Sequence, residues 1–278
     1  MNRTKSVAAA ALPFTVAVAA SAVALVRKAR TTRKFERLGA ASLETLLNAI
    51  DANDPVTGAH VRRVARYSIV LADAMGVNDH DCHTIERVAL FHDIGKIHEA
   101  LFDVIHEDSK PTAEERRAIN THPERGAEVL QPLAAFYPDL PEGVLSHHER
   151  WDGTGYPRGL KGNAIPLSAR IVAIADTFDA VTQTRPYRPG RPVSVGEDVI
   201  AEGRGTQFEP DLVDLFLSPP VLQCIRSEKD AAAKNTDQRS ARPKTRKDEV
   251  MDVPDVRFRW RGTAPTPHAG DQPSETAH

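Results

Sequence analysis

Apolar residues recur every three or four positions along most of the chain between residues 42 and 218, which is the period of a helix with one buried face. Ser42 is a suitable N-cap for the first such helix, and Glu44 lies in its first turn. Its apolar positions are Leu43, Leu46, Leu47 and Ile50. Asp54-Pro55 is expected to end this helix, because proline cannot continue it.

The same period predicts further helices downstream, each opened by a turn or a capping residue. Their expected starting points are the segment 57–60, Asp81, Thr112, Pro166, Val193 and Glu209. Thr112 forms a capping box with Glu115, and its helix is expected to carry His122. All the elements that these patterns predict are helices.

The chain opens with an uncharged run from Val7 to Val26, which is long enough to cross a bilayer as a helix. More positive charge follows the run than precedes it, so the positive-inside rule places the rest of the chain in the cytoplasm. We expect residues 1–30 to hold an anchor in the cytoplasmic membrane and residues 31–41 to form a basic linker. A cleaved signal peptide or a leader helix of a soluble cytoplasmic protein are the alternatives.

Apolar periodicity fades beyond Pro219-Pro220. Residues 227–278 are polar and contain several prolines, and we expect them to be disordered. Within them, residues 257–261 alternate basic and aromatic side chains, which would suit a membrane or a partner, but an unstructured tail is the favoured interpretation. One domain is therefore predicted at residues 42–226, without an internal repeat or a separate sensor domain.

Composition limits the classes of function. The chain has 278 residues, 41% of them hydrophobic, which is enough for one good-sized core. A net charge of −2 excludes a nucleic-acid-binding protein that works by overall basicity. The only cysteines, Cys82 and Cys224, are far apart in the sequence, which excludes a cysteine-rich zinc site.

Side chains able to bind a transition metal gather in the middle of the chain. They are the dipeptide His92-Asp93, His122, the pair His147-His148, and Asp176 within an apolar helix. A lone histidine on an apolar face is usually a satisfied core residue, but this set together points to a metal. A buried carboxylate needs a counter-ion, which for Asp176 is a metal or, failing that, Arg170. Imidazole and carboxylate ligands suit Fe, Mn or Zn.

The adjacency of His92 and Asp93 favours a dinuclear site. The imidazole can hold one ion while the carboxylate, with its two oxygens, bridges to a second. Two ions about 3.5–4 Å apart can clamp a phosphate and lower the pKa of a shared water. The residues therefore indicate a phosphoester hydrolase as a hypothesis.

Three ordered motifs make the chain similar to the HD-GYP family, a branch of the HD-domain metal-dependent phosphohydrolases. They are HDIGK at residues 92–96, HHExxDGTGYP at 147–157 and RPYR at 185–188. The resemblance extends from about residue 42 to about residue 218. It implies an all-helical fold, two divalent ions with iron or manganese preferred, and hydrolysis of the bacterial second messenger cyclic di-GMP to pGpG or GMP.

The resemblance also implies roles for individual residues. His60 matches the family's upstream metal ligand, which makes the expected metal-binding set His60, His92, Asp93, His122, His147, His148 and Asp176. Asp93 is expected to bridge the ions and to act in catalysis with Lys96. The expected substrate contacts are Lys96, Tyr156, Arg185 and Arg188. The glycine-rich loop that ends at Tyr156 is also a candidate surface for a signalling partner.

The chain departs from the family pattern at two places. Family members that hold three metals have a glutamate four positions before the upstream histidine, and this chain has Val56 there. We therefore expect two ions, and we interpret Asp54 as a turn residue. Residues 98–112 also replace the family's substrate-contacting loop, and His98 and His106 are expected to lie there as solvated residues rather than ligands.

The predicted function is metal-dependent hydrolysis of a cyclic di-GMP phosphodiester bond. The altered loop supports one alternative, an HD-type phosphohydrolase that acts on another cyclic nucleotide. A non-catalytic module that binds cyclic di-GMP or a partner protein is the other alternative, and the nearly complete ligand set disfavours it.

Overall fold

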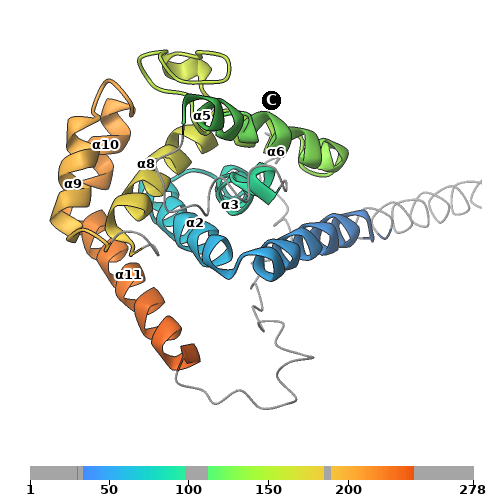
Figure 1. Cartoon of the computed structure of the whole chain (residues 1–278), viewed down its shortest axis with the longest axis horizontal. Helices are drawn as coiled ribbons and strands as arrows, with labels where there is room; N and C mark the ends of the chain where they lie inside the picture. Colours follow the sequence, from blue (N-terminus) through green and yellow to red (C-terminus); the bar gives the residue numbers. More distant parts are fainter. Residues whose placement is uncertain (1–29, 31–33, 98–111, 185–188, 241–278) are drawn as a thin grey trace, which may run out of the picture. The chain divides into compact units, whose positions relative to one another are not determined.

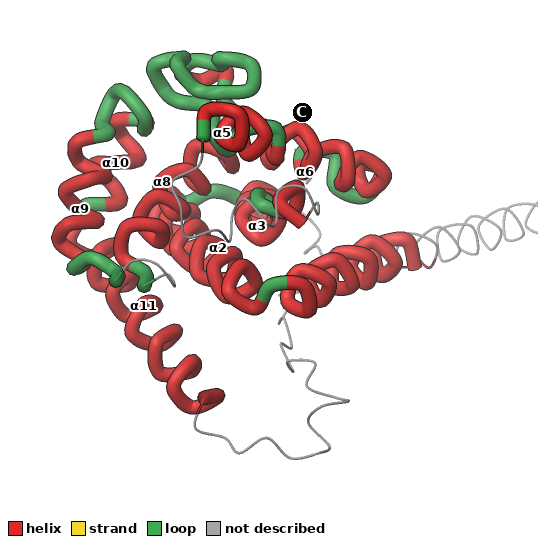
Figure 2. The backbone as a smooth tube through the Cα atoms, viewed as in Figure 1, coloured by secondary structure: helices red, strands yellow, loops and turns green. Residues whose placement is uncertain are grey.

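The computed structural model describes residues 30, 34–97, 112–184 and 189–240, and over these residues the predicted all-α fold is confirmed (Figures 1 and 2). A helix over residues 34–53 comes first. It is followed by α2 (Pro55–Met75), α3 (Asp79–Phe91), η1 (Ile94–Ile97), α5 (Ala113–Ile119), α6 (His122–Leu130), η2 (Gln131–Ala135), α7 (Leu140–Leu145), η3 (Gly162–Ala164), α8 (Leu167–Thr182), α9 (Val193–Glu202), α10 (Pro210–Phe216) and α11 (Pro219–Ser240).

The core forms where α2, α3 and α8 pack against one another. Figure 1 shows these helices together in the middle of the described part, with α9 and α10 on one side and α6 on the other. The side chains at the centre are fully buried, at 0% exposure: Val61, Val64, Val88, Ile171, Val172 and Phe178. Close packing of such side chains fixes the helices that carry His60 and Asp176 relative to each other.

The first helix begins earlier than predicted. Residues 34–53 form one helix, and Ser42 lies inside it with its hydroxyl donating to the carbonyl oxygen of Leu38 at 2.9 Å. The prediction of an N-cap at Ser42 is therefore wrong. Gly39 packs so tightly that an added Cβ would lie 3.0 Å from the Phe136 ring. This tertiary contact outweighs the low helix propensity of glycine.

The break at Asp54-Pro55 is confirmed, and Asp54 caps α2. Its Oδ1 accepts a hydrogen bond from the backbone N–H of Val56 at 2.9 Å, and its Oδ2 accepts one from the Thr57 hydroxyl at 2.5 Å. Asp54 therefore serves the helix start, in agreement with its interpretation as a turn residue.

The capping box of Thr112 and Glu115 is confirmed, but the helix that it opens is short. It ends at Ile119, and His122 begins a separate helix, α6, with Pro123 in its first turn. The expectation of one helix reaching His122 is wrong. Proline suits the first turn of a helix because no hydrogen bond from its nitrogen is needed there, and this chain uses it to start α6 at a histidine.

The expectation of disorder from residue 227 is wrong for residues 227–240, because α11 continues to Ser240. Val221 and Ile225, one turn apart, are 4% and 0% exposed, and α11 packs against α2. Lys229 donates from Nζ to the carbonyl oxygen of Thr182 at 2.9 Å. A narrow apolar contact therefore supports α11, and its polar composition concealed it in the sequence.

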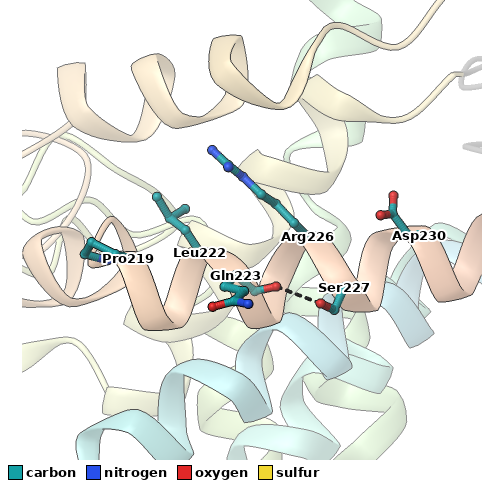
Figure 3. A pocket seen from close by; sticks show the side chains of 6 residues that line it. All are labelled: Pro219, Leu222, Gln223, Arg226, Ser227 and Asp230. Atoms are coloured by element: carbon teal, nitrogen blue, oxygen red, sulfur yellow. Dashed lines mark hydrogen bonds between the residues drawn. The ribbon is translucent and has the colours of Figure 1, made fainter.

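The outer side of α11 carries an open groove of about 510 Å³ (Figure 3). Its lining residues are Pro219, Leu222, Gln223, Arg226, Ser227 and Asp230. Arg226 pairs with Glu197 of α9, with Nη2 and Oε1 2.6 Å apart. None of the candidate metal ligands lines this groove.

Among the described residues, no helix is both long enough and apolar enough to span a bilayer. The anchor predicted at residues 7–26 and the basic-aromatic segment at 257–261 lie outside the described residues.

We predict that Ile225→Ala will lower the free energy of unfolding by about 2–5 kcal/mol, because the substitution removes buried methyl groups at the contact with α2. Urea denaturation followed by circular dichroism measures this change. Gln223→Ala, on the exposed side of the same helix, is the matched control and should change stability by less than about 0.5 kcal/mol. Equal stability of the two variants would contradict the packing role of α11.

Candidate metal centre

The predicted ligands converge from five places in the fold. His60 lies on α2, His92 ends α3, and Asp93 follows it in the turn before η1. The others are His122 at the start of α6, His147 and His148 after α7, and Asp176 on α8. His148 and Asp176 are partly exposed, while the remaining members are buried. Segments more than a hundred positions apart thus meet in one cluster.

Asp93 lies between two groups of nitrogen atoms. Its Oδ2 is 3.5 Å from His92 Nε2 and 3.8 Å from His60 Nε2, while its Oδ1 is 3.4 Å from His122 Nε2. Each of these separations is too long for a good hydrogen bond. The two oxygens of one carboxylate thus face two different sets of imidazoles, which is the arrangement that a bridging ligand requires.

The donor atoms form two groups that could each hold a cation. One consists of His60, His92 and Asp93, and the other of His122, His147 and His148, with the ligand atoms of each group within 4.8 Å of one another. Asp176 adjoins the first group, with Oδ1 3.2 Å from His60 Nε2. Nitrogen and oxygen donors without thiolates suit iron, manganese or zinc.

Three of the histidines are held by the backbone carbonyls of residues three positions earlier in the chain. His92, His122 and His147 place Nδ1 at 2.8, 2.7 and 2.6 Å from the oxygens of Ala89, Ile119 and Val144. A carbonyl oxygen only accepts hydrogen bonds, so each Nδ1 must donate its proton there. In the neutral rings the lone pair is therefore on Nε2, the atom that points into the cluster.

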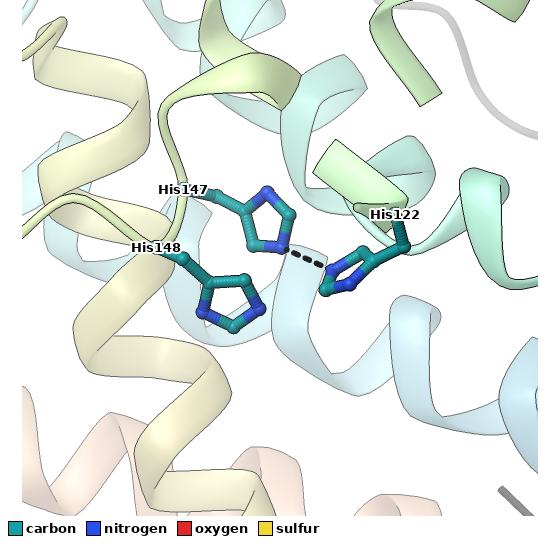
Figure 4. A group of neighbouring side chains, drawn as sticks. All are labelled: His122, His147 and His148. Carbon is teal, nitrogen blue, oxygen red and sulfur yellow. Dashed lines mark hydrogen bonds between the residues drawn. The ribbon is translucent and has the colours of Figure 1, made fainter. Parts of the chain in front are cut away.

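Two of these lone pairs face each other. Figure 4 shows that the rings of His122 and His147 point toward each other, and their Nε2 atoms are 3.1 Å apart. Burial lowers the pKa of His122 to about 3 and also lowers that of His147, which leaves both rings neutral near pH 7. Two facing lone pairs repel unless a cation lies between or beside them. The donors present therefore fit a bound metal ion.

His92 supports the same conclusion. Its Nε2 is buried and, within the described residues, has no hydrogen-bond partner. The nearest polar atom of Asp93 is an oxygen 3.5 Å away, which is also an acceptor. An unpaired buried acceptor costs stability, and a cation near both atoms would remove that cost.

The two carboxylates of the cluster are ionised. Burial alone would raise the pKa of Asp93, but the Lys96 ammonium, 2.6 Å from its Oδ1, and the neighbouring histidines hold the pKa well below its usual range. Burial is likewise outweighed at Asp176 by the hydrogen bond from His60, which lowers the pKa of this carboxyl. Burial alone would lower the pKa of His60, but its hydrogen bonds to Asp176 and Asp179 raise that pKa to about 9. Lys96 thus offsets the charge of Asp93, and the His60 ring offsets that of Asp176.

Glycine at position 95 allows the His92-Asp93 turn to approach α6 closely. A Cβ on Gly95 would lie 2.1 Å from the carbonyl oxygen of His122 and 2.7 Å from the nitrogen of Gly126. No side chain fits at those distances. The backbone at Gly95 therefore lies directly against α6, and this approach brings Asp93 beside His122.

The glycine-rich loop is held rigidly beside the cluster. The buried carboxylate of Glu149 accepts hydrogen bonds from the backbone N–H groups of Arg158 and Leu160 at 2.8 and 3.0 Å. The Tyr156 ring stacks on His148 with centroids 4.9 Å apart. Burial, followed by the charges of Asp93 and Asp176, raises the pKa of the Tyr156 hydroxyl. The loop therefore lies beside the centre, as expected of a segment that contributes Tyr156 to the substrate contacts.

Several predicted positions are not part of the cluster. Arg170 pairs with Glu209, with Nη1 and Oε2 2.6 Å apart, and it is not the partner of Asp176. Val56 is 56% exposed on the outside of α2. The remaining positions, Arg185, Arg188, His98 and His106, lie outside the described residues.

Sequence reasoning missed two buried acids beside the centre. Asp179 accepts a hydrogen bond from His60 Nδ1 at 2.7 Å and is also paired with Arg63. Glu149 holds the glycine-rich loop, as described above. Two features of the sequence could have identified them. Asp179 falls three residues after Asp176, on the same face of an apolar helix, and Glu149 directly follows the histidine pair.

The fold and the cluster define the class of protein. A family model described as an HD domain matches residues 44–212, more than half of the chain. The chain therefore belongs to the HD-domain family. Its predicted membership of the HD-GYP branch is confirmed.

Three curated relatives match between 62% and 71% of the chain. The 3'3'-cGAMP-specific phosphodiesterase 2 of Vibrio cholerae is 39% identical over 175 residues, which cover 62% of this chain and 33% of the relative. The cyclic di-GMP phosphodiesterase response regulator RpfG of Xanthomonas campestris is 37% identical, with 63% and 47% covered. For a cyclic di-GMP phosphodiesterase of Thermotoga maritima the identity is 35%, with 71% and 54% covered. The chain thus spans between a third and about half of these relatives' length.

Metal removal should destabilise the protein. An ion present at roughly 100 times its Kd adds about 2.7 kcal/mol to the free energy of unfolding, and a chelator should remove this gain and lower the melting temperature. In His147→Ala the melting temperatures with Mn²⁺ and with chelator should differ less than in wild type. His80 is an exposed histidine outside the cluster, and His80→Ala should keep the wild-type difference. Identical melting of wild type with Mn²⁺ and with chelator would exclude a metal in this cluster.

Glu149→Gln should lower the free energy of unfolding by about 1–3 kcal/mol, because the amide nitrogen would face one of two buried N–H donors and leave it unsatisfied. Glu142→Gln is the matched control: Glu142 is 48% exposed and pairs with the side chain of Arg158. Glu142→Gln should lower the free energy of unfolding by less than about 1 kcal/mol. Chemical denaturation of both variants measures the difference, and a smaller loss for Glu149→Gln than for Glu142→Gln would contradict the loop-holding role.

Proposed function

We propose that this protein is a metal-dependent phosphodiesterase that hydrolyses cyclic di-GMP to pGpG, GMP or both. The observation that carries the proposal is the position of Asp93, whose two oxygens face two separate groups of nitrogen donors. A dinuclear arrangement of this kind is suited to phosphoester hydrolysis.

The residues that would hold the two ions are His60, His92, Asp93 and Asp176 on one side and Asp93, His122, His147 and His148 on the other. Iron or manganese is the proposed metal, because the ligands are imidazoles and carboxylates. Two bound divalent ions would supply a positive clamp for the phosphate and a water of lowered pKa for attack on phosphorus. With only two carboxylates among these ligands, the loaded centre keeps a net positive charge, which favours an anionic phosphodiester.

The chain's own residues would complete the site. Lys96 keeps its ammonium 2.6 Å from Asp93 Oδ1 while its side chain is 28% exposed, so it can offset negative charge that develops on the phosphate. Tyr156, stacked on His148, would contact the substrate from the side of the glycine-rich loop. Arg185 and Arg188 are proposed to contact phosphates through bidentate hydrogen bonds.

The names of the relatives support a cyclic dinucleotide as the substrate. Two of those reported above are cyclic di-GMP phosphodiesterases, and one is specific for 3'3'-cGAMP. The latter, at 39% identity, favours cGAMP as a second candidate substrate. The unusual residues 98–112 fall where the resemblance places substrate contacts, and they are the segment in which a change of preference would arise.

Two further features belong to the proposal. The run from Val7 to Val26 would anchor the protein in the cytoplasmic membrane, with the phosphodiesterase domain in the cytoplasm; its length and the basic residues after it support this. The glycine-rich loop would also bind a signalling partner, since Thr154, Arg158 and Gly159 are exposed on a loop that Glu149 holds in place.

Asp93→Ala should reduce hydrolysis of cyclic di-GMP to the level of buffer without enzyme, because it removes the bridging carboxylate. Product analysis by liquid chromatography, on protein loaded anaerobically with Fe²⁺ or with Mn²⁺, measures this loss. Asp139→Asn, an exposed carboxylate outside the cluster, should retain wild-type turnover. Unchanged turnover of Asp93→Ala would remove Asp93 from the mechanism.

A panel of cyclic di-GMP, 3'3'-cGAMP and linear pGpG separates the candidate functions. Cleavage of cyclic di-GMP supports the proposal, and cleavage of cGAMP alone supports the second substrate. If the protein retains its metals, binds a cyclic dinucleotide and cleaves neither, it is a binding module and the enzymatic proposal fails.

A further inference from the structure

The histidines of the cluster are oriented in two different ways. His92, His122 and His147 are held through Nδ1 by the backbone carbonyl oxygens of residues three positions earlier in the chain. His60 is held through Nδ1 by a side chain, the carboxylate of Asp179, 119 positions away in the sequence. Backbone carbonyls remain when a side chain is replaced. Of these four histidines, His60 is therefore the one whose orientation a single substitution can alter.

Asp179 is itself firmly held. Its side chain is 1% exposed, and Arg63 donates from Nε to Oδ1 at 2.7 Å and from Nη2 to Oδ2 at 2.9 Å. The same Oδ2 accepts the hydrogen bond from His60 Nδ1 at 2.7 Å. A bidentate arginine fixes the plane of a carboxylate as well as its position. Asp179 is thus a rigid acceptor for the His60 ring.

The four residues connect two helices. His60 and Arg63 lie three positions apart on α2, and Asp176 and Asp179 lie three positions apart on α8. The His60 ring spans the two acids, with Nε2 3.2 Å from Asp176 Oδ1 and Nδ1 2.7 Å from Asp179 Oδ2. Asp179 therefore contacts the side of the ring opposite to the cluster. It can act on a bound ion only through His60.

We propose that Asp179, held by Arg63, is a positioning residue that orients His60 and thereby sets the metal affinity of the His60–His92–Asp93 group, leaving the His122–His147–His148 group unaffected. The inference rests on the proposed dinuclear centre. It goes beyond that proposal because it states that different residues set the affinities of the two metal sites. A carboxylate that accepts the Nδ1 proton of a ligating histidine fixes the ring and makes its other nitrogen a stronger donor. Removing such a partner typically weakens metal binding roughly 10-fold to 100-fold.

Three variants separate orientation from charge. Asp179→Asn keeps an oxygen that can accept from His60 Nδ1 but removes the negative charge. Asp179→Ala removes both, and Arg63→Gln removes the clamp on Asp179. Asp214→Asn is the matched control, because Asp214 also pairs with an arginine, Arg204, through two hydrogen bonds of 2.7 Å, but on the exposed surface.

The experiment counts and titrates Mn²⁺ on the full-length protein, by equilibrium dialysis with elemental analysis, while circular dichroism monitors folding. Wild type and Asp214→Asn should bind two ions. In Asp179→Ala the Kd of one ion should rise roughly 10-fold to 100-fold while the other Kd stays unchanged, with a smaller rise in Asp179→Asn. Arg63→Gln should weaken the same ion, and should add nothing in the Asp179→Ala background, because Arg63 acts through Asp179.

Each other result has a distinct meaning. Two unchanged Kd values in Asp179→Ala would overturn the positioning role, and equal weakening of both ions in a folded variant would overturn its selectivity. If Asp179→Ala does not fold, Asp179→Asn and Arg63→Gln decide by the same two criteria. Wild type that binds fewer than two ions would overturn the dinuclear centre itself, a failure that is visible before any variant is compared.

Discussion

The structure depends on one electrostatic constraint, the presence of an ionised carboxylate, Asp93, among buried imidazoles. Such a group is costly unless cations surround it. Lys96 provides one positive charge at Oδ1, whereas His122 and His147 are neutral and provide nitrogen lone pairs rather than charge. The remaining cost would be met by metal ions, one on each side of the carboxylate. The apolar packing of α2, α3 and α8 keeps these acceptors together despite their mutual repulsion.

The elements around the cluster differ in how they hold their ligands. Three histidines sit at helix ends or just beyond them, where Nδ1 reaches a carbonyl of the preceding turn. These carbonyls are free because the last turn of a helix lacks partners for them, and α5 offers one to His122 across the break before α6. His60, in contrast, depends on a side chain of another helix. Three histidines of the centre are thus held by residues close in the sequence, and His60 is held by a residue far away in the sequence.

Two of the three corrected helices, the first helix and α11, show how tertiary contacts change a prediction from pattern. Gly39 lies within a helix because its missing side chain lets Phe136 approach, and α11 persists because Val221 and Ile225 reach the core while most of its surface is polar. In both cases the local pattern was weak and a contact with a distant segment supplied the stability. The predicted break at Asp54-Pro55 and the capping box at Thr112 are confirmed because both are decided within four residues.

The sequence by itself determined the helical class, most helix starts, the types of donor atom and the identity of the residues that converge. These follow from the periodicity of apolar side chains, from capping, and from the chemistry of imidazole and carboxylate, all of which are local properties. His60 alone was assigned through the resemblance to the HD-GYP family. The tertiary structure alone decided that the two oxygens of Asp93 face different histidines, that the Nε2 atoms of His122 and His147 oppose each other, and that Asp179 supports His60. Apart from the neighbouring pair His92 and Asp93, those relations join residues 25 to 119 positions apart. Only the packing of the helices brings such atoms together, because no short-range rule fixes the direction of a side chain toward a partner so distant in the chain.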